Sequence, residues 1–166
     1  MKQNSCFLLR KLFFSLELWT LVKDNVCYEG KDDVYGAFTF QRDGIVSAIK
    51  LQHISGLITC NKDNPNFGSG IWTCNHDNTK LSTVITDINK TVIFPPNVTM
   101  AETVQKVIFG DKDAYRMTPT ELYFIKPTLH VNAGDSLQIW NTNDYGDTHD
   151  ADNAGRHCVK VYAKFK

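Results

Sequence analysis

Short runs of apolar, β-branched and aromatic residues, separated by turn residues, recur along most of this chain, and helical periodicity is almost absent. Several of the connections carry turn chemistry, such as "RDG" at 42–44, "SG" at 55–56 and "AGD" at 133–135. Each run is too short for a stable helix and has the length of a strand. The pattern therefore predicts an all-β protein, an antiparallel β-sandwich of about nine strands.

The predicted strands cover residues 18–22, 35–41, 45–52, 56–60, 81–87, 90–95, 121–126, 135–141 and 157–165. The last of them alternates most clearly, since Val159, Val161 and Ala163 share one face while Lys160 faces the other way with Cys158. A disulfide formed by this cysteine would therefore lie off the main core. The longest connection, 97–120, contains "MAETVQKVIF", for which we expect a helical turn or two.

The length and composition fit a single domain. The chain has 166 residues, of which 42% are hydrophobic and 22% charged, and these are ordinary globular values. Its 18 acidic and 18 basic residues give no case for nucleic acid or an anionic membrane as a partner. No apolar run is long enough to span a membrane. We read residues 1–15 as a degraded, signal-like leader and residues 16–166 as one β-sandwich domain.

Four cysteines remain once Cys6 of the leader is set aside, and none of them forms a CxxC pair. Four cysteines allow three connectivities, of which we favour Cys60–Cys74, closing a loop rich in glycine and asparagine, with Cys27–Cys158 joining the first and last strand regions. Two N-x-T sequons, at Asn89 and Asn97, suggest glycosylation. These features favour a secreted, extracellular protein with two disulfides; four reduced thiols in an intracellular protein are the alternative.

The loop 143–155 gathers four aspartates without a lysine between them. Its flanking strands hold both ends, which lowers the entropy cost of collecting ligands around an ion. Carboxylate and amide oxygens suit calcium, and the loop's asparagine and glycines allow turns that aim backbone carbonyls inward. A solvated loop is the plainer alternative, and the EF-hand pattern is missing. We therefore expect a calcium site whose acidic ligands are Asp144, Asp147, Asp150 and Asp152.

Two other kinds of site compete for this loop. Glycosidase carboxylates stand across a cleft, commonly on separate elements, whereas these four share one loop. Zinc would use His149 and His157, but no cysteine completes a set. No nucleophile–base arrangement or G-x-S-x-G motif is present, so we do not expect an enzyme.

The run "GDSLQIWNTNDYGDTHDADNAGRHCVKVYA" resembles the end of the bacterial calcium-dependent galactose-binding lectin family. There, an apolar strand is followed by an Asn-Asp pair, a short loop, two adjacent amide residues, a small residue and glycine, and then the last strand. The upstream "GAFTFQRDGIVSAIKLQHISGLIT" is similar to the first hairpin of that family, which has a G-x-V-[ST]-x-I core. The cysteine placement and the start of the chain are closer to secreted modules of marine invertebrates that have no established activity.

The resemblance implies a galactose-binding, jelly-roll-like sandwich with a definite ligand set. Asp144 matches the acid that contacts both calcium and sugar, Asp152 and Asn153 match the amide pair, and a carbonyl near Thr148 and another after Cys60 complete the ligands. The loop is one residue longer here, and Asp152 stands where the family has asparagine. The sugar-contacting residues of the neighbouring loop in that family do not align with this chain, and we name Asn75 and His76 in their place.

The function implied is a calcium-dependent lectin that binds glycans or extracellular matrix glycoproteins, with sugar hydroxyls held directly at the ion. One such site binds a single sugar weakly, so useful avidity requires multivalency, and an oligomer would provide it. The alternative is a structural or adhesive extracellular domain in which calcium only stiffens the loop. Trp72, Trp140 and Tyr145 are aromatic residues that could stack on a sugar, although we expect Trp140 to be buried.

Overall fold

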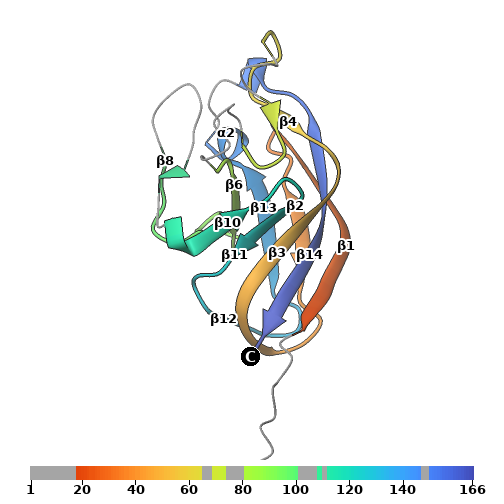
Figure 1. The fold of residues 1–166 in the computed structure, drawn as a ribbon, viewed down its shortest axis with the longest axis vertical. Helices are drawn as coiled ribbons and strands as arrows, with labels where there is room; N and C mark the ends of the chain where they lie inside the picture. Colours follow the sequence, from red (N-terminus) through yellow and green to blue (C-terminus); the bar gives the residue numbers. More distant parts are fainter. Residues whose placement is uncertain (1–17, 65–68, 74–80, 101–107, 110–111, 147–149) are drawn as a thin grey trace, which may run out of the picture.

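Two antiparallel sheets make up most of the protein. The computed structural model describes residues 18–64, 69–73, 81–100, 108–109, 112–146 and 150–166. The larger sheet has the order β1-β14-β3-β11-β10, with β12 also paired to β3. Its strands are β1 (Trp19–Glu29), β3 (Gly44–Gly56), β10 (Tyr115–Met117), β11 (Glu121–Phe124), β12 (Leu129–Val131) and β14 (Arg156–Phe165). The long strands β1, β3 and β14 run side by side, although they are far apart in sequence (Figure 1).

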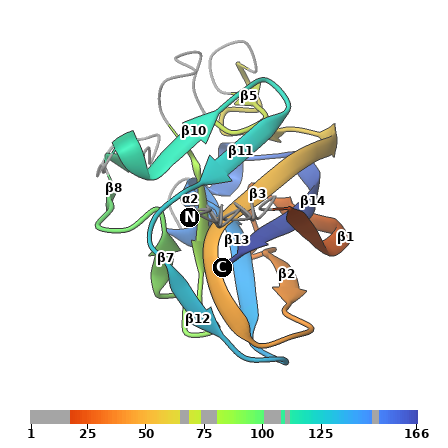
Figure 2. The same ribbon diagram turned by 60° about the horizontal axis from the view of Figure 1, so that its bottom comes forward.

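The smaller sheet has the order β2-β13-β6-β7. Its strands are β2 (Gly36–Thr39), β6 (Thr83–Thr86), β7 (Val92–Phe94) and β13 (Ser136–Asn141). Two short pairs lie outside the main sheets, β4 (Ile58–Thr59) with β5 (Ser69–Gly70) and β8 (Thr99–Met100) with β9 (Ile108–Phe109). Three short helices complete the described elements: η1 (Lys112–Ala114), α2 (Thr142–Tyr145) and η2 (Asp150–Asp152). Figure 2 shows β13 of the smaller sheet lying behind β3 of the larger one.

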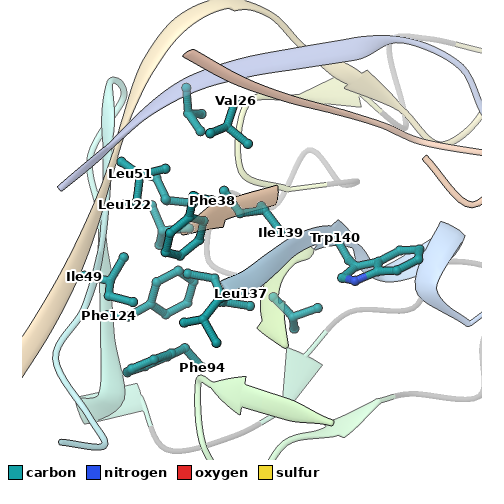
Figure 3. Close-up of a cluster of buried hydrophobic side chains, with 14 of the residues drawn as sticks. Val26, Phe38, Ile49, Leu51, Phe94, Leu122, Phe124, Leu137, Ile139 and Trp140 are labelled. Carbon is teal, nitrogen blue, oxygen red and sulfur yellow. The ribbon is translucent and has the colours of Figure 1, made fainter. Parts of the chain in front are cut away.

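The hydrophobic core lies between the two sheets. Val159, Val161 and Ala163 on β14 are fully buried, as the alternation in the sequence predicts. Phe94 and Phe124 meet from opposite sheets with ring centroids 6.0 Å apart. Burying side chains of this size stabilises a fold by roughly 1.5–3 kcal/mol each. The residues labelled in Figure 3 are Val26, Phe38, Ile49, Leu51, Phe94, Leu122, Phe124, Leu137, Ile139 and Trp140.

The predicted antiparallel β-sandwich is confirmed, with differences in single elements. Strand β1 continues to Glu29, beyond the expected end at residue 22, because irregularities in its register accommodate the polar residues between Leu21 and Val26. Strands β10 and β12 were not expected, since each has only three residues and Pro119 and Pro127 stand close by. The prediction of a helical turn within 100–109 is wrong for the two ends of this segment, which belong to strands β8 and β9. Residues 101–107 lie outside the described part of the chain.

The predicted disulfide between Cys27 and Cys158 is confirmed. The two residues are register partners on β1 and β14, where Val26 and Val159 beside them point into the core. Because neighbouring side chains of a strand face opposite ways, the bridge lies on the outer face of the larger sheet. Cys60 is also disulfide-bonded, but its predicted partner Cys74 lies outside the described residues, so this second pairing stays a prediction.

Residues 1–17, which include the expected leader, lie outside the described part of the chain. Within the described residues, no helix has both the length and the apolar character needed to cross a membrane. The sequon residues Asn89 and Asn97 are both exposed, and their glycosylation stays a prediction.

Candidate functional site

A short helix at the end of β13 places the first half of the acidic loop. Asn141 caps helix α2, and its side-chain oxygen accepts a hydrogen bond from the backbone N–H of Asn143 at 3.0 Å. Asparagine suits this position because its short carboxamide reaches an otherwise unsatisfied N–H group. The helix buries its next three side chains against the sandwich, those of Thr142, Asn143 and Asp144, and Asp144 is 1% exposed.

The carboxylate of Asp144 is held by the turn between β1 and β2. Its Oδ1 accepts a hydrogen bond from the backbone N–H of Asp33 at 2.8 Å. Asp32 and Asp33 have φ values of 65° and 57°. This left-handed region is uncommon for residues other than glycine, although aspartate is enriched there. The strained turn therefore aims one backbone donor at the buried acid, and such strain is typical of functional sites.

Lys90 fixes the same turn from the side of the smaller sheet. Its Nζ lies 2.9 Å from Oδ1 of Asp33, and its own φ is 62°. The hydrogen bond to Asp33 raises the pKa of Lys90 above its usual range, and the charge of Asp144 acts in the same direction. The backbone carbonyl of Lys90 accepts a hydrogen bond from Tyr145 Oη at 2.7 Å. Two separate turns and helix α2 thus meet around one carboxylate.

The second half of the acidic loop returns to the same place. Helix η2 is followed by Asn153, which is 1% exposed. Nδ2 of Asn143 donates a hydrogen bond to Oδ1 of Asn153 at 3.4 Å. Asn153 at one end of the loop therefore contacts Asn143, the residue that precedes Asp144, at the other end.

The loop after Cys60 lies against this second half. Thr59 and Ala154 exchange two backbone hydrogen bonds of 2.7 Å, and the N–H of Lys62 donates to the carbonyl of Asp152 at 2.6 Å. Gly155 permits the approach, since it has a φ of 94° and a Cβ there would lie 2.3 Å from the carbonyl oxygen of Leu57. The resemblance predicts a carbonyl ligand from this loop, and its proximity is consistent with that prediction.

Two buried polar atoms of the loop have no hydrogen-bond partner among the described residues, Oδ1 of Asp152 and Nδ2 of Asn153. A buried polar atom left unsatisfied costs about 1–3 kcal/mol, and more if it is charged. A bound cation would offset this cost at a carboxylate oxygen. The oxygen-rich set of Asp144, Asp152 and Asn153 fits the chemistry that calcium prefers.

The other predicted ligands and sugar contacts fall largely outside the described part of the chain. The residues outside this part are Asp147, Thr148, Asn75 and His76. For Asp150, only the backbone is described. Within the part of the chain that the structure describes, no three histidine, cysteine, aspartate or glutamate side chains form a group that could hold a metal ion. The predicted calcium ligands are of a different kind, because they include amide and backbone carbonyl oxygens as well as carboxylates.

His157, on β14 just after the loop, belongs to a buried row of hydrogen-bonded side chains. Nδ1 of His157 lies 2.8 Å from Oη of Tyr28, and its Nε2 lies 3.0 Å from Nδ1 of His53. Tyr28 also contacts Oγ1 of Thr83 at 3.2 Å. Burial, together with the charge of a protonated His53, lowers the pKa of His157 to about 3, and burial raises the pKa of Tyr28. Both ring nitrogens of His157 are engaged, so the zinc alternative finds no support here.

The aromatic residues singled out in the sequence divide into two groups. Trp72 and Trp140 are 4% and 1% exposed and belong to the core, and Tyr145 is half-buried. Residues 71–73 and 117–119 line a hollow of about 330 Å³. Asn75 and His76 follow this segment in the sequence and lie outside the described part.

Two residues of the site were not identified from the sequence, Asp33 and Lys90. They reach the acidic loop only through tertiary contacts, since Asp33 and Asp144 are 111 positions apart. The one local signal is the pair of aspartates in "KDDVYG", because aspartate is favoured in turns with positive φ.

The protein is an antiparallel β-sandwich in which loop 143–155 carries one buried acid, Asp144, and one buried amide residue, Asn153. No protein-family model matches the chain, and no curated protein matches it. Among solved structures, the chain is similar to AJLec from the sea anemone Anthopleura japonica, a lectin. The TM-score is 0.74 at 24% sequence identity, over 89% of this chain and 97% of AJLec. The two chains share a fold, and the resemblance to the bacterial calcium-dependent family stays a prediction.

Proposed function

We propose that the protein is a secreted carbohydrate-binding domain of the lectin type, in which loop 143–155 holds calcium and sugar hydroxyls together. The main support is that the two ends of the loop meet through the 3.4 Å contact between Asn143 and Asn153, with Asp144 buried directly after Asn143. The shared fold with a sea anemone lectin adds to it. The Cys27–Cys158 disulfide is typical of proteins in an oxidising, extracellular compartment.

The residues of the loop would bind both the ion and the sugar hydroxyls. Asp144, Asp152 and Asn153 would hold the ion, with Asp147, Asp150 and the Thr148 carbonyl as further ligands. When bound, calcium supplies a positive charge that attracts the oxygens of two vicinal hydroxyls. Asp144 and Asn153 would also hydrogen-bond these hydroxyls, so the selectivity for one sugar would follow from hydroxyl geometry. The hydrogen bond from Asp33 keeps the Asp144 carboxylate oriented before any ligand arrives.

The test is a glycan array probed with calcium and then with a chelator. We expect calcium-dependent signal, lost with the chelator, and calorimetric uptake of calcium by the metal-free protein. Asp144→Asn keeps the shape and the acceptor for Asp33 but removes the charge, so it should weaken calcium binding roughly 10–100-fold.

Asp24→Asn is the matched control, since Asp24 is an exposed acid at the other end of the sequence that pairs with Lys160. It should bind calcium and glycans as the wild type does. Glycan signal that persists in the chelator, or unchanged calcium binding in Asp144→Asn, would contradict the proposal.

The burial of Asp144 also favours a second candidate, a structural or adhesive domain in which calcium only stiffens the loop. A carboxylate that is 1% exposed and bonded to a neighbouring turn holds helix α2 and that turn together even without a sugar. A calcium-raised melting temperature with a blank glycan array would support this candidate over the first.

A further inference from the structure

An exposed tyrosine lies next to the candidate site and is not used by it. Tyr35 is 42% exposed, although its ring centroid lies only 4.8 Å from that of Trp140, with an angle of 35° between the rings. Trp140 is 1% exposed and lies at one end of the core cluster (Figure 3). Part of the tyrosine ring therefore covers the indole while another part faces solvent. An aromatic ring with this support is fixed in position, which lowers the entropy cost of binding to it.

Lys90 contacts the same indole ring. Its Nζ lies 4.5 Å from the Trp140 ring centroid, and its side chain is 49% exposed. An ammonium group has three N–H donors, and the bond to Asp33 is one polar contact of this group. The surface around Trp140 thus combines an aromatic ring with hydrogen-bond donors. This combination is typical of sites that bind the apolar face and the hydroxyls of a sugar ring.

Short covalent and hydrogen-bonded links connect this surface to the candidate calcium site. Asp33, whose N–H holds Asp144, precedes Tyr35 by two residues. On the other side, Tyr145 follows Asp144 directly, and its ring lies 6.0 Å from that of Trp140. Oδ1 of Asp144 therefore lies within about 10 Å of the Tyr35 backbone, a distance that a disaccharide can cover, because two consecutive residues span roughly 7 Å.

We propose that Tyr35 and Lys90 form a second saccharide subsite, so that the ligand is a neutral oligosaccharide of at least two residues. This inference rests on the proposed function, which supplies the first subsite at Asp144. The charge of Lys90 is already balanced by Asp33, so the surface has no excess positive charge that would select an anionic sugar. The subsite takes the sugar residue next to the one at the ion.

The test compares monosaccharides with the disaccharides that carry them at the non-reducing end. Calorimetry would use two matched pairs, galactose with lactose and mannose with mannobiose, in the presence of calcium. For the pair that binds, the wild type should bind the disaccharide more tightly. Tyr35→Ala should reduce disaccharide affinity about three- to tenfold and leave monosaccharide and calcium affinity unchanged.

Tyr35→Phe is the matched control, because it keeps the ring and should retain the preference for the disaccharide. Equal affinity of the wild type for both members of a pair, or an equal loss for both in Tyr35→Ala, would overturn the subsite while leaving the proposed function intact. Absence of calcium-dependent binding to either pair and to the glycan array would instead overturn both. Unchanged calcium affinity in Tyr35→Ala shows that the variant is folded at the site.

Discussion

Replacing Cys27 and Cys158 together by alanine is expected to lower the free energy of unfolding by about 4 kcal/mol. The two residues are 131 positions apart, and a cross-link over such a long loop restricts the unfolded chain strongly. Little packing should be lost, because both side chains are only half-buried on the outer face of the larger sheet. Urea unfolding should show a lower midpoint and a larger m-value, since the unfolded chain becomes less compact.

Lys160→Ala is the matched control for the disulfide. Lys160 pairs with Asp24 at 3.0 Å, so this exposed ion pair joins the same two strands without a covalent link. Exposed ion pairs contribute little, so the unfolding midpoint of this variant should equal that of the wild type. A double alanine variant that unfolds at the wild-type urea concentration would show that backbone pairing alone holds β1 to β14.

Acidification is expected to destabilise the protein through His157 by about 1.4 kcal/mol for each pH unit between about pH 5.5 and 4. The pKa of this histidine is about 3 in the folded protein, against an ordinary value of 6.5. Below pH 6.5 the unfolded chain binds a proton that the folded protein excludes. The stabilisation is therefore complete above pH 6.5 and is progressively lost as the pH falls towards 3.

The surroundings of His157 explain why its imidazole does not take up a proton in the folded protein. It is fully buried between β1 and β3 and meets Tyr28 and His53, and the Trp72 ring lies 4.9 Å away. Among the described contacts of the ring, none is with a carboxylate that would balance a positive charge, and His53 adds repulsion when it is protonated. Desolvation of the imidazolium is the largest contribution.

His157→Phe isolates the effect, because it keeps an aromatic ring against Trp72 and removes the titratable group. We expect this variant to lose less stability than the wild type when urea unfolding is repeated from pH 7 to pH 4. His130→Gln, on the exposed side of β12, should follow the wild type over the same range. Parallel curves for the wild type and His157→Phe would contradict the assignment.

The alternation of apolar residues was sufficient to predict β14 and most of β3, but only the first part of β1. Val159, Val161 and Ala163 follow the alternation because one face of β14 packs on the core while the other is partly exposed. The pattern fails where backbone geometry departs from a regular ladder, as in β1 between Leu21 and Val26. Short strands such as β10 carry too few residues for any alternation to be recognised.

Local sequence was sufficient to predict that strands anchor both ends of the acidic loop, and the ligand set stays a prediction. The acidic loop and its anchoring strands are adjacent along the chain, so Asp144 and Asn153 could be named. Asp33 and Lys90 could not be named, because their contacts depend on how distant turns are brought together by the two sheets. Tyr35 was missed for the same reason, since its partner Trp140 is on a different strand.

The irregular register of β1 affects how copies of this protein could associate. This strand forms a border of the larger sheet, and its ladder with β14 shifts twice, around Lys23. Bulges and an exposed lysine make a border strand a poor template for growth by a second copy of the chain. Association of several copies would therefore need faces other than this border.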